Sequence, residues 1–355
     1  MPYLVPDKVV EPLYAIVPYF NPWRWKSREK HTIRALKHFH DSGAVIILVE
    51  AAFNRREFAF KDSGLDGTAA DCGVLGSDAR FRHRYIALRT RDELWLKENL
   101  INAGVAIALP YDWQQVCWLD SDVHFVRPNW VGECIHKLQH YKFIQMFSHA
   151  RDLAPNYELL AHDYPHADGL SWMQAHYNDA LASTLKRGGP SYPYAAGQVF
   201  PGLAWACTRQ AWDEVGGLID FAVWGGADWH MAHALIERPD SMMRNDLHPN
   251  YRQMVNAWLE KCRRHIRRNV GVMEGSIFHS WHGRKLARGY NAKHALLAKI
   301  GFDPIRHLKR DYQGLYQLHD DGSEAYVQLR DTMRVIAKER NEDSIDTDIG
   351  EHQGH

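Results

Sequence analysis

Two short runs of apolar, mostly β-branched residues near the amino end constrain the fold more than any other feature of the sequence. They are residues 14–20 (YAIVPYF) and 44–50 (AVIILVE), and both have the character of buried strands. The segment between them has helical spacing at Ile33, Leu36 and Phe39. A helical connection of this length favours a right-handed crossover between parallel strands. The sequence therefore predicts an α/β domain with a mostly parallel central sheet.

Three more segments continue this alternation of strands and helices. Residues 83–89 (HRYIALR) are the next expected strand, and residues 91–104 (RDELWLKENLINAG) have the spacing of a helix that ends at Gly104. A further strand, QQVCWLDSD, ends in Asp120 and Asp122. Because ligands of open α/β sheets bind at the carboxyl ends of the strands, we expect this pair at a ligand site.

The two aspartates need a compensating charge. Carboxylates one residue apart repel each other, and desolvating either is costly unless a cation or a donor lies beside it. Aspartate is also common in turns after strands, which is the purely structural interpretation. We favour a bound divalent metal, because Asp120 and Asp122 follow directly on the apolar run VCWL.

Composition excludes several classes of protein. The 355 residues are enough for one large α/β domain, and Lys plus Arg and Asp plus Glu both number 43, so the total charge demands no polyanionic partner. The 5 cysteines are odd in number and form no CxxC, which argues for reduced thiols. Prolines and charges interrupt the amino-terminal apolar stretch, so we expect no signal peptide, no membrane span and a cytoplasmic location.

Two histidines mark a second candidate segment, FHSWHG. His279 and His282 flank a tryptophan and could reach a divalent ion together with the aspartates. The alternative is that both are partly buried histidines without a ligand, which is the commoner case for any one histidine.

A glycine pair marks a third segment, WGGADWH. Gly225 and Gly226 would let a substrate approach the backbone, and Asp228 is then placed as a general base. The structural alternative is a turn followed by a helix that Asp228 caps.

Two other segments carry weaker indications. Residues 261–268 (KCRRHIRR) contain a basic run, interpreted as a solvated helix face, with contact to phosphate or modified nucleic acid as the alternative. Residues 151–195 are rich in Pro, Tyr, His and Asp and predict a loop-dominated lobe that faces a substrate. Its aromatic side chains would bind an acceptor by stacking: Tyr157, Tyr164, Trp172, Tyr177, Tyr192 and Tyr194.

Taken in order along the chain, these segments resemble one family. The motifs are VPYFN, LVE, WLKENLINAG, WLDSDVHF, PGLAWACTRQAWDEVGG, WGGADWHMA and HSWHG, within residues 14–290. Their order is similar to that of the GT-A glycosyltransferases, and closest to the β-1,4-galactosyltransferase-like superfamily. The resemblance implies a GT-A (Rossmann-like) fold, in which helices flank a mostly parallel sheet and a loop-rich lobe lies on the acceptor side.

The resemblance also implies roles for individual residues. The nucleotide-sugar donor would be bound by Pro18, Tyr19, Phe20, Glu50, Trp95, Lys97, Asn102, Asp120, Asp122, Gly225 and Gly226. Mn²⁺, or Mg²⁺ in its place, would be held by Asp122 and His279, with His282 as the competing histidine and Asp120 at the ribose or a metal-bound water. Asp228 would be the base that deprotonates the acceptor hydroxyl.

The implied activity is transfer of a sugar from a nucleotide-diphosphate sugar, expected to be a UDP-sugar, to an acceptor hydroxyl, with inversion. The family has a glutamate that helps to recognise the acceptor sugar, and this chain has Ala227 at that position. The resemblance therefore does not imply which acceptor this chain uses. A glycan, a glycolipid or another hydroxylated molecule is expected, with modified nucleic acid as an alternative.

The chain is expected to divide into three parts. A GT-A domain would cover residues 1–300, with a donor half at about 14–127 and an acceptor half at about 128–290. A helical extension would follow at 301–340, and a polar tail at 341–355 is expected to be disordered.

Three rival functions come from other classes. A phosphohydrolase would use the first Asp of the pair as its nucleophile. A metal-dependent hydrolase would be built on the HxxH of His279 and His282. A non-catalytic module would bind the nucleotide-sugar and turn nothing over.

Overall fold

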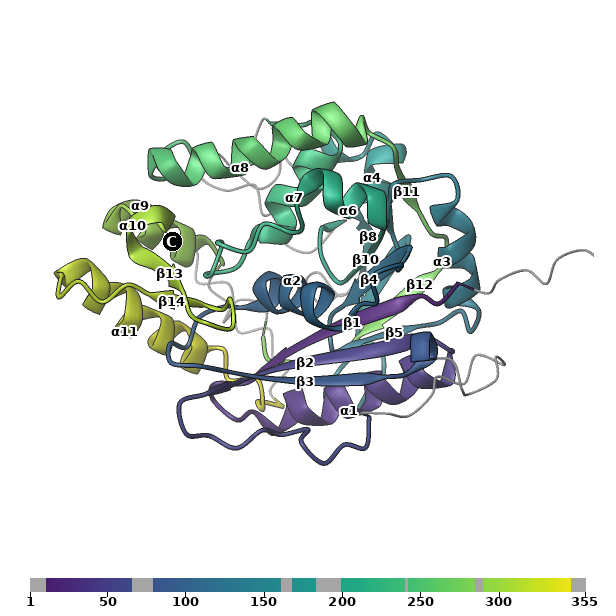
Figure 1. Ribbon diagram of the computed structural model, residues 1–355, viewed down its shortest axis with the longest axis horizontal. Helices are drawn as coiled ribbons and strands as arrows, with labels where there is room; N and C mark the ends of the chain where they lie inside the picture. The colour runs from purple at the N-terminus through teal and green to yellow at the C-terminus, as the bar shows by residue number, and fades with distance from the viewer. Residues whose placement is uncertain are drawn as a thin grey trace, which may run out of the picture.

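The computed structural model describes residues 11–65, 79–160, 168–182, 199–239, 242–284 and 290–345. Its centre is a 7-stranded sheet (Figure 1). In spatial order the strands are β11 (Val270–Val272), β6 (Phe143–Gln145), β10 (Ala204–Thr208), β4 (Gln115–Leu119), β1 (Tyr14–Phe20), β2 (Val45–Phe53) and β3 (Arg84–Thr90). All neighbours are parallel except β10, which is antiparallel to β4 and to β6. The predicted mostly parallel sheet is confirmed.

Helices cover both faces of this sheet, so its central strands are buried along their whole length (Figure 1). Successive side chains of a strand point to opposite faces. On one face Ala15 and Val17 of β1 pack with α1 (Lys26–Asp41) and α3 (Trp130–Leu138). On the other face Tyr14 and Ile16 share a core with four helices: α2 (Lys97–Ala108), α6 (Arg209–Val215), α7 (Ala227–Leu235) and α8 (Pro249–Lys261).

The helix that contains Gly104 runs further than the sequence predicts. Gly104 was expected to end it, but α2 continues to Ala108. A Cβ at Gly104 would lie 2.7 Å from Val49 Cγ2 and 2.9 Å from Ile16 Cγ2. Glycine is therefore required here for the close approach of α2 to β1 and β2 and not for a turn.

A second sheet of 5 strands lies beside the carboxyl ends of the first. Its order is β5 (Val123–Phe125), β12 (Ser276–His279), β7 (His149–Asp152), β8 (Asp168–Ser171) and β9 (Val199–Phe200). Strand β12 is antiparallel to β5 and parallel to β7. This sheet brings the end of the FHSWHG segment to the residues that follow β4.

The expected loop-dominated lobe contains regular structure where it is described. Besides the end of β7 and the strand β8, it holds α4 (Trp172–Tyr177), whose first turn is capped by Ser171. Elsewhere short helical turns occur at η1 (Ala79–Phe81) and at the π-helical η2 (Cys262–Ile266).

The extension after residue 300 is only partly helical. It follows α9 (Tyr290–Ile300) and consists of α10 (Pro304–His307), the hairpin of β13 (Leu308–Arg310) and β14 (Tyr316–Leu318), and α11 (Glu324–Glu339). Residues 341–345 were expected to begin a disordered tail, but they pack against α1: Glu342 is 1% exposed and Asp343 accepts hydrogen bonds from the backbone of Lys26 and Ser27. Residues 346–355 lie outside the described part of the chain.

Within the described ranges, no helix is long and apolar enough to cross a membrane. The cysteines of these ranges, Cys117, Cys134, Cys207 and Cys262, are buried free thiols, as predicted. Cys72 lies outside them.

Gly104→Ala should lower the free energy of unfolding by about 1–3 kcal/mol, because the added methyl overpacks the contact of α2 with the sheet. Urea denaturation measures the change. Ile107→Ala is the matched control, since Ile107 lies on the same helix, is 57% exposed, and should change stability by about 0.5 kcal/mol or less. Equal effects of the two substitutions would contradict the close-packing explanation.

Candidate metal and nucleotide-sugar site

The strand order reverses between β1 and β4. The chain builds outward from β1 through β2 to β3, and then β4 pairs on the other side of β1. Open α/β sheets bind ligands at such a reversal of strand order. Asp120 follows directly on β4, and Tyr19 and Phe20 end β1.

A carboxylate and two imidazoles converge near the carboxyl end of β4. His279 Nε2 and His282 Nε2 each lie 3.6 Å from Asp122 Oδ2. The two Nε2 atoms are 3.0 Å apart. In the described part of the chain these three residues are the group of His, Cys, Asp and Glu side chains whose ligand atoms are close enough to share one metal ion. His279 and His282, which the sequence analysis treats as competitors for one ligand position, therefore both lie within reach of the same ion.

The three side chains of this cluster are suited to bind a divalent cation. Asp122 Oδ1 is buried and has no hydrogen-bond partner among the described residues, a costly state for a carboxylate oxygen in the apo protein. Two imidazole nitrogens facing each other also need a proton or a cation between them. The imidazoles favour a first-row transition-metal ion over Ca²⁺ or Mg²⁺, and the carboxylate is a ligand type that suits Mn²⁺.

Asp152 orients one of these histidines, a role that the sequence analysis missed. Its Oδ1 lies 2.6 Å from His279 Nδ1, and both side chains are buried. A carboxylate on Nδ1 fixes the tautomer that leaves Nε2 as the ligand atom. The contact follows from the register in which His279 pairs with Asp152 between β12 and β7. The one indication in the sequence is that HARD, like VCWLD, is a short strand that ends in aspartate.

Charges around Asp122 hold it ionised. Burial opposes ionisation, but His279, His31 and Arg28 keep the pKa of Asp122 well below its usual range. Burial would likewise lower the pKa of His279, yet the carboxylates of Asp122 and Asp152 outweigh it and raise that pKa to about 9. Without a cation, His279 is thus an imidazolium at neutral pH.

Asp120 is not part of this cluster. It forms an ion pair with Lys97, with Lys97 Nζ 2.6 Å from Asp120 Oδ1. Burial raises the pKa of Asp120 against the attraction of Lys97. The expectation that Asp120 is a metal ligand is therefore not supported by the geometry, and a contact with ribose stays a prediction.

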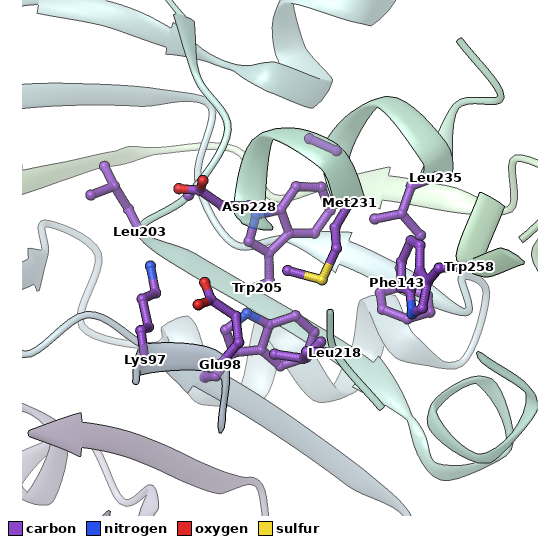
Figure 2. Close-up of a pocket in the computed structure, with 13 residues that line it drawn as sticks. Lys97, Glu98, Phe143, Leu203, Trp205, Leu218, Asp228, Met231, Leu235 and Trp258 are labelled. Carbon is purple, nitrogen blue, oxygen red and sulfur yellow. The ribbon is translucent and has the colours of Figure 1, made fainter. Parts of the chain in front are cut away.

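A small cavity next to Lys97 contains the expected base (Figure 2). Lys97 and Glu98 extend into it from α2, and Asp228 lies at its edge on the first turn of α7. Asp228 Oδ1 accepts a hydrogen bond of 2.8 Å from the backbone of Trp229. A Cβ at Gly202 would collide with Asp228 Oδ2, so the glycine of the motif PGLAWAC makes room for this carboxylate.

Glu98 is a second carboxyl group in this cavity that the sequence analysis did not select. It is 4% exposed, and burial raises its pKa to about 8. Its position was visible in the sequence, because it falls between Leu94 and Ile101 on the apolar face of the expected helix. An acidic residue on such a face is a candidate for a perturbed pKa.

The glycine pair adopts the backbone conformation that favours glycine. Gly225 and Gly226 have φ of 89° and 91° and lead into α7. A Cβ at Gly225 would be 4.0 Å from the ring of Trp95, so this turn packs on the indole. Trp95 is half-buried and packs edge-on against Phe20 at 5.1 Å. Phe20, Trp95 and Gly225 thus lie together, and their contact with a donor stays a prediction.

Other predicted donor residues have structural partners. Glu50 accepts hydrogen bonds from the backbone of Ala59 and Phe60 and from the Tyr85 hydroxyl, which anchors the loop after β2. Asn102 holds the backbone of Leu218 through both of its amide atoms. Direct contact of either side chain with a donor stays a prediction.

Pro18 and Tyr19 are buried near the end of β1, where Pro18 pairs with Val49. Tyr19 receives a hydrogen bond of 3.1 Å from Asn21, and burial raises its pKa to about 12. Their role at the donor likewise stays a prediction.

The aromatic residues of the lobe do not form one stacking surface where they are described. Trp172 is fully buried against Trp229, and the Tyr177 hydroxyl donates to Val270 O. Tyr157 packs under Arg34, with the guanidinium carbon 3.9 Å from the ring centre. Full burial excludes Trp172 from an acceptor-facing surface, whereas stacking of an acceptor on Tyr157 or on the 51% exposed Tyr177 stays a prediction. Tyr164, Tyr192 and Tyr194 lie outside the described residues.

The basic run lies near the amino end of β4, whereas the candidate metal site lies near its carboxyl end. Arg264 and Arg267 line an open groove with Gln115, the first residue of β4, whereas Asp120 follows the last. Five residues of strand at about 3.3 Å each separate the two ends by roughly 15 Å. The alternative in which this run contacts a phosphate-bearing acceptor at the site is therefore not supported.

No family model matches the chain, and no curated protein matches it. Three solved structures illustrate what its fold is similar to. A Drosophila β-1,4-galactosyltransferase 7 variant in complex with manganese, UDP-Gal and xylobiose is 10% identical over 63% of this chain and 60% of its own, with a TM-score of 0.26. A protein from Desulfovibrio desulfuricans described as a nucleotide-diphospho-sugar transferase is 13% identical over 93% of this chain and 99% of its own, with a TM-score of 0.35.

The third is glucosyl-3-phosphoglycerate synthase from Mycobacterium tuberculosis in complex with Mn²⁺, UDP and phosphoglyceric acid. It is 10% identical over 82% of this chain and 76% of its own, with a TM-score of 0.36. The likenesses are distant, so the function of this chain is proposed below from its own residues.

Binding of Mn²⁺ should release a proton at neutral pH, because His279 is protonated below its pKa of about 9 and must lose that proton to become a ligand. Calorimetry in buffers of different ionisation enthalpy counts the proton. Apparent affinity should rise with pH, by up to about tenfold per unit, until His279 is neutral. Asp152→Asn should reduce the release, since it removes a charge that raises the pKa; release of no proton by the unsubstituted protein would refute the assignment of His279.

Proposed function

We propose that this protein is a metal-dependent glycosyltransferase that moves a sugar from a nucleotide-diphosphate sugar to an acceptor hydroxyl. The observation that carries the proposal is the convergence of Asp122, His279 and His282 at the carboxyl end of β4. Asp228, the carboxylate proposed as the base, lines the same cavity as Lys97. The two sites would serve the donor and the acceptor respectively.

The donor side has the groups that a diphosphate requires. Asp122, His279 and His282 would hold a divalent ion, whose positive charge would stabilise the leaving diphosphate. Lys97 stays protonated, because Asp120 and Asp228 outweigh the effect of burial and raise its pKa. The half-buried Trp95 offers an aromatic face for a base or sugar. A UDP-sugar with Mn²⁺ is the proposed donor.

The transfer step would use Asp228 as the base. The acceptor oxygen attacks the anomeric carbon and forms the glycosidic bond, while the bond from that carbon to the diphosphate oxygen breaks and the nucleoside diphosphate leaves with the electron pair. Asp228 takes the proton of the acceptor hydroxyl. Its hydrogen bond from the backbone of Trp229 orients the carboxylate for this role, and attack from the side opposite the diphosphate inverts the configuration.

The rival functions fit the geometry less well. A phosphohydrolase needs a free aspartate nucleophile and an all-oxygen Mg²⁺ site, whereas Asp120 is paired with Lys97 and two ligands here are imidazoles. A hydrolase built on the two histidines has its metal ligands in Asp122, His279 and His282, but it gives no role to Asp228 in the neighbouring cavity. The proposed acceptor is a hydroxylated molecule such as a glycan or glycolipid.

Two substitutions should separate donor binding from transfer. Asp122→Ala removes the carboxylate shared by both histidines and should abolish Mn²⁺-dependent binding of UDP. Asp228→Asn should leave that binding within about twofold and lower the rate of transfer by about 10²–10⁴-fold, the contribution typical of a general base. Calorimetry with UDP and Mn²⁺ measures the first quantity, and a screen of nucleotide-sugars for turnover measures the second. Equal loss of UDP binding in both variants would show that the roles are wrongly assigned.

The metal requirement has its own test. UDP should raise the melting temperature in Mn²⁺ and leave it unchanged in EDTA, since the diphosphate and Asp122 repel each other without a cation. A non-catalytic module would show the same shift and no turnover of any nucleotide-sugar. A shift of the same size in EDTA would rule out a metal-dependent donor site.

A further inference from the structure

The groove that contains the basic run lies at the amino ends of the central strands. It is formed mainly by the residues before β4 and β6, by the start of α6, and by η2 with the residues that follow it. Its volume is about 900 Å³, which is within the range of small-molecule pockets. The candidate metal site lies beyond the other end of β4, so the proposed function assigns no role to this groove.

Two arginines of the groove are not neutralised by an acidic side chain. Arg264 and Arg267 are exposed, and neither has a carboxylate partner among the described residues. Arg267 Nε donates to the carbonyl oxygen of Arg264 at 3.0 Å, a contact that leaves both charges in place. The other Lys and Arg side chains of the groove are paired, Lys142 with Glu214 at 2.7 Å and Arg209 with a carboxylate of its own helix. The groove therefore carries an excess of positive charge, although the whole chain carries none.

The backbone adopts an uncommon conformation where it presents these arginines. Helix α8 leads into the π-helical turn η2, and Arg267 and Arg268 follow with φ of 53° and 57°. Glycine or asparagine usually occupies a left-handed position at the end of a helix, because a larger side chain is strained there. Strained backbone and π-helical turns are both concentrated at functional sites. Of the two residues only Arg267 lines the groove, whereas Arg268 donates to Glu237.

Exposed amide groups supply most of the remaining hydrogen-bonding capacity of the groove. The side chain of Gln139 has no partner among the described residues, and Gln114 and Gln210 each use only Nε2, so their amide oxygens can accept from a ligand. Tyr141 is the one Phe, Tyr or Trp among the described lining residues, and its ring packs against Gly271. A nucleic-acid base thus finds little aromatic surface for stacking, whereas sugar hydroxyls find several amides.

We propose that this groove is a second ligand site and that it binds a phosphorylated sugar. Arg264 and Arg267 hold the phosphate, because a guanidinium donates parallel N–H bonds to two phosphate oxygens. The glutamine amides bind the sugar hydroxyls. The inference is independent of the proposed function, since it uses no residue of the metal cluster or of the cavity that contains Asp228.

A solvated helix face is the structural interpretation of the same arginines. It requires only that the side chains be exposed, which a regular helix would also provide. It gives no reason for the left-handed backbone at Arg267 or for the polar groove beside it. It predicts that removal of Arg264 or Arg267 changes the binding of no ligand.

The test compares each groove arginine with a neighbouring arginine that does not line the groove. Arg264→Ala is matched by Arg263→Ala, and Arg267→Gly is matched by Arg268→Gly, whose backbone has nearly the same φ. Calorimetry on the full chain measures binding of glucose 6-phosphate, inorganic phosphate and glucose. EDTA is present throughout, so that the candidate metal site takes no part.

We expect Arg264→Ala and Arg267→Gly each to weaken glucose 6-phosphate by about tenfold or more, the effect of losing a hydrogen-bonded charge. The two controls should change it by about twofold or less, since each removes the same charge from outside the groove. Glucose should bind much more weakly than its phosphate. Arg267→Gly should not lower the melting temperature, because glycine accepts the left-handed conformation without strain, so it tests the site even where Arg264→Ala is unstable.

Several results would overturn the proposal. No binding of glucose 6-phosphate at millimolar concentration would exclude the site, and so would equal weakening by the groove variants and their controls, because that result assigns binding to general positive charge. Inorganic phosphate that binds as tightly as glucose 6-phosphate would show that the amides do not recognise a sugar. A single-stranded DNA oligonucleotide that binds in the groove where glucose 6-phosphate does not would assign it to nucleic acid instead.

Discussion

The register of β12 in the second sheet is the constraint on which the candidate site depends. His279 pairs with Val123 of β5 on one side and with Asp152 of β7 on the other. Because side chains alternate along a strand, a slip of one residue would turn His279 to the other face and remove it from both aspartates. The position of His279 in the candidate metal-binding cluster, its contact with Asp152 and its raised pKa therefore follow from one pairing.

The same geometry explains how two aspartates one residue apart coexist in a buried place. Lys97 pairs with Asp120, and the histidines face Asp122, so each carboxylate has its own positive partner. Lys97 is the first residue of α2, whereas His279 ends β12 of the second sheet and His282 follows it. The positive partners of the two aspartates therefore come from different parts of the fold. The two carboxylates still influence each other, since burial and the negative charge of Asp122 both raise the pKa of Asp120 against the attraction of Lys97.

Local periodicity was enough to predict the parallel core and the place of the aspartates, because β1, α1, β2 and β4 obey simple spacing rules. Residues whose role depends on distant partners were not predictable. Gly104 was taken for a helix end because only the packing of α2 on Ile16 and Val49 shows why it lacks a side chain. Asp152 needed the pairing of β7 with β12, and Glu342 needed an arginine 314 positions away. Polar composition alone made residues 341–345 look like a tail.

Residues 340–345 attach the end of the described chain to α1, and the loss of chain entropy that this attachment requires is modest. Closing a loop costs entropy that grows only with the logarithm of its length, about 0.6 kcal/mol for each doubling. Fastening residues 340–345 to α1 is therefore little harder than fastening a much shorter loop, once the domain between them is folded. Trp25, the N-cap residue of α1, has no side-chain oxygen, and Asp343 accepts the hydrogen bonds of the first turn instead. Arg28 of the same turn also donates to the carbonyl of Phe20 and pairs with Glu342, so residues 340–345 are connected through α1 to the end of β1.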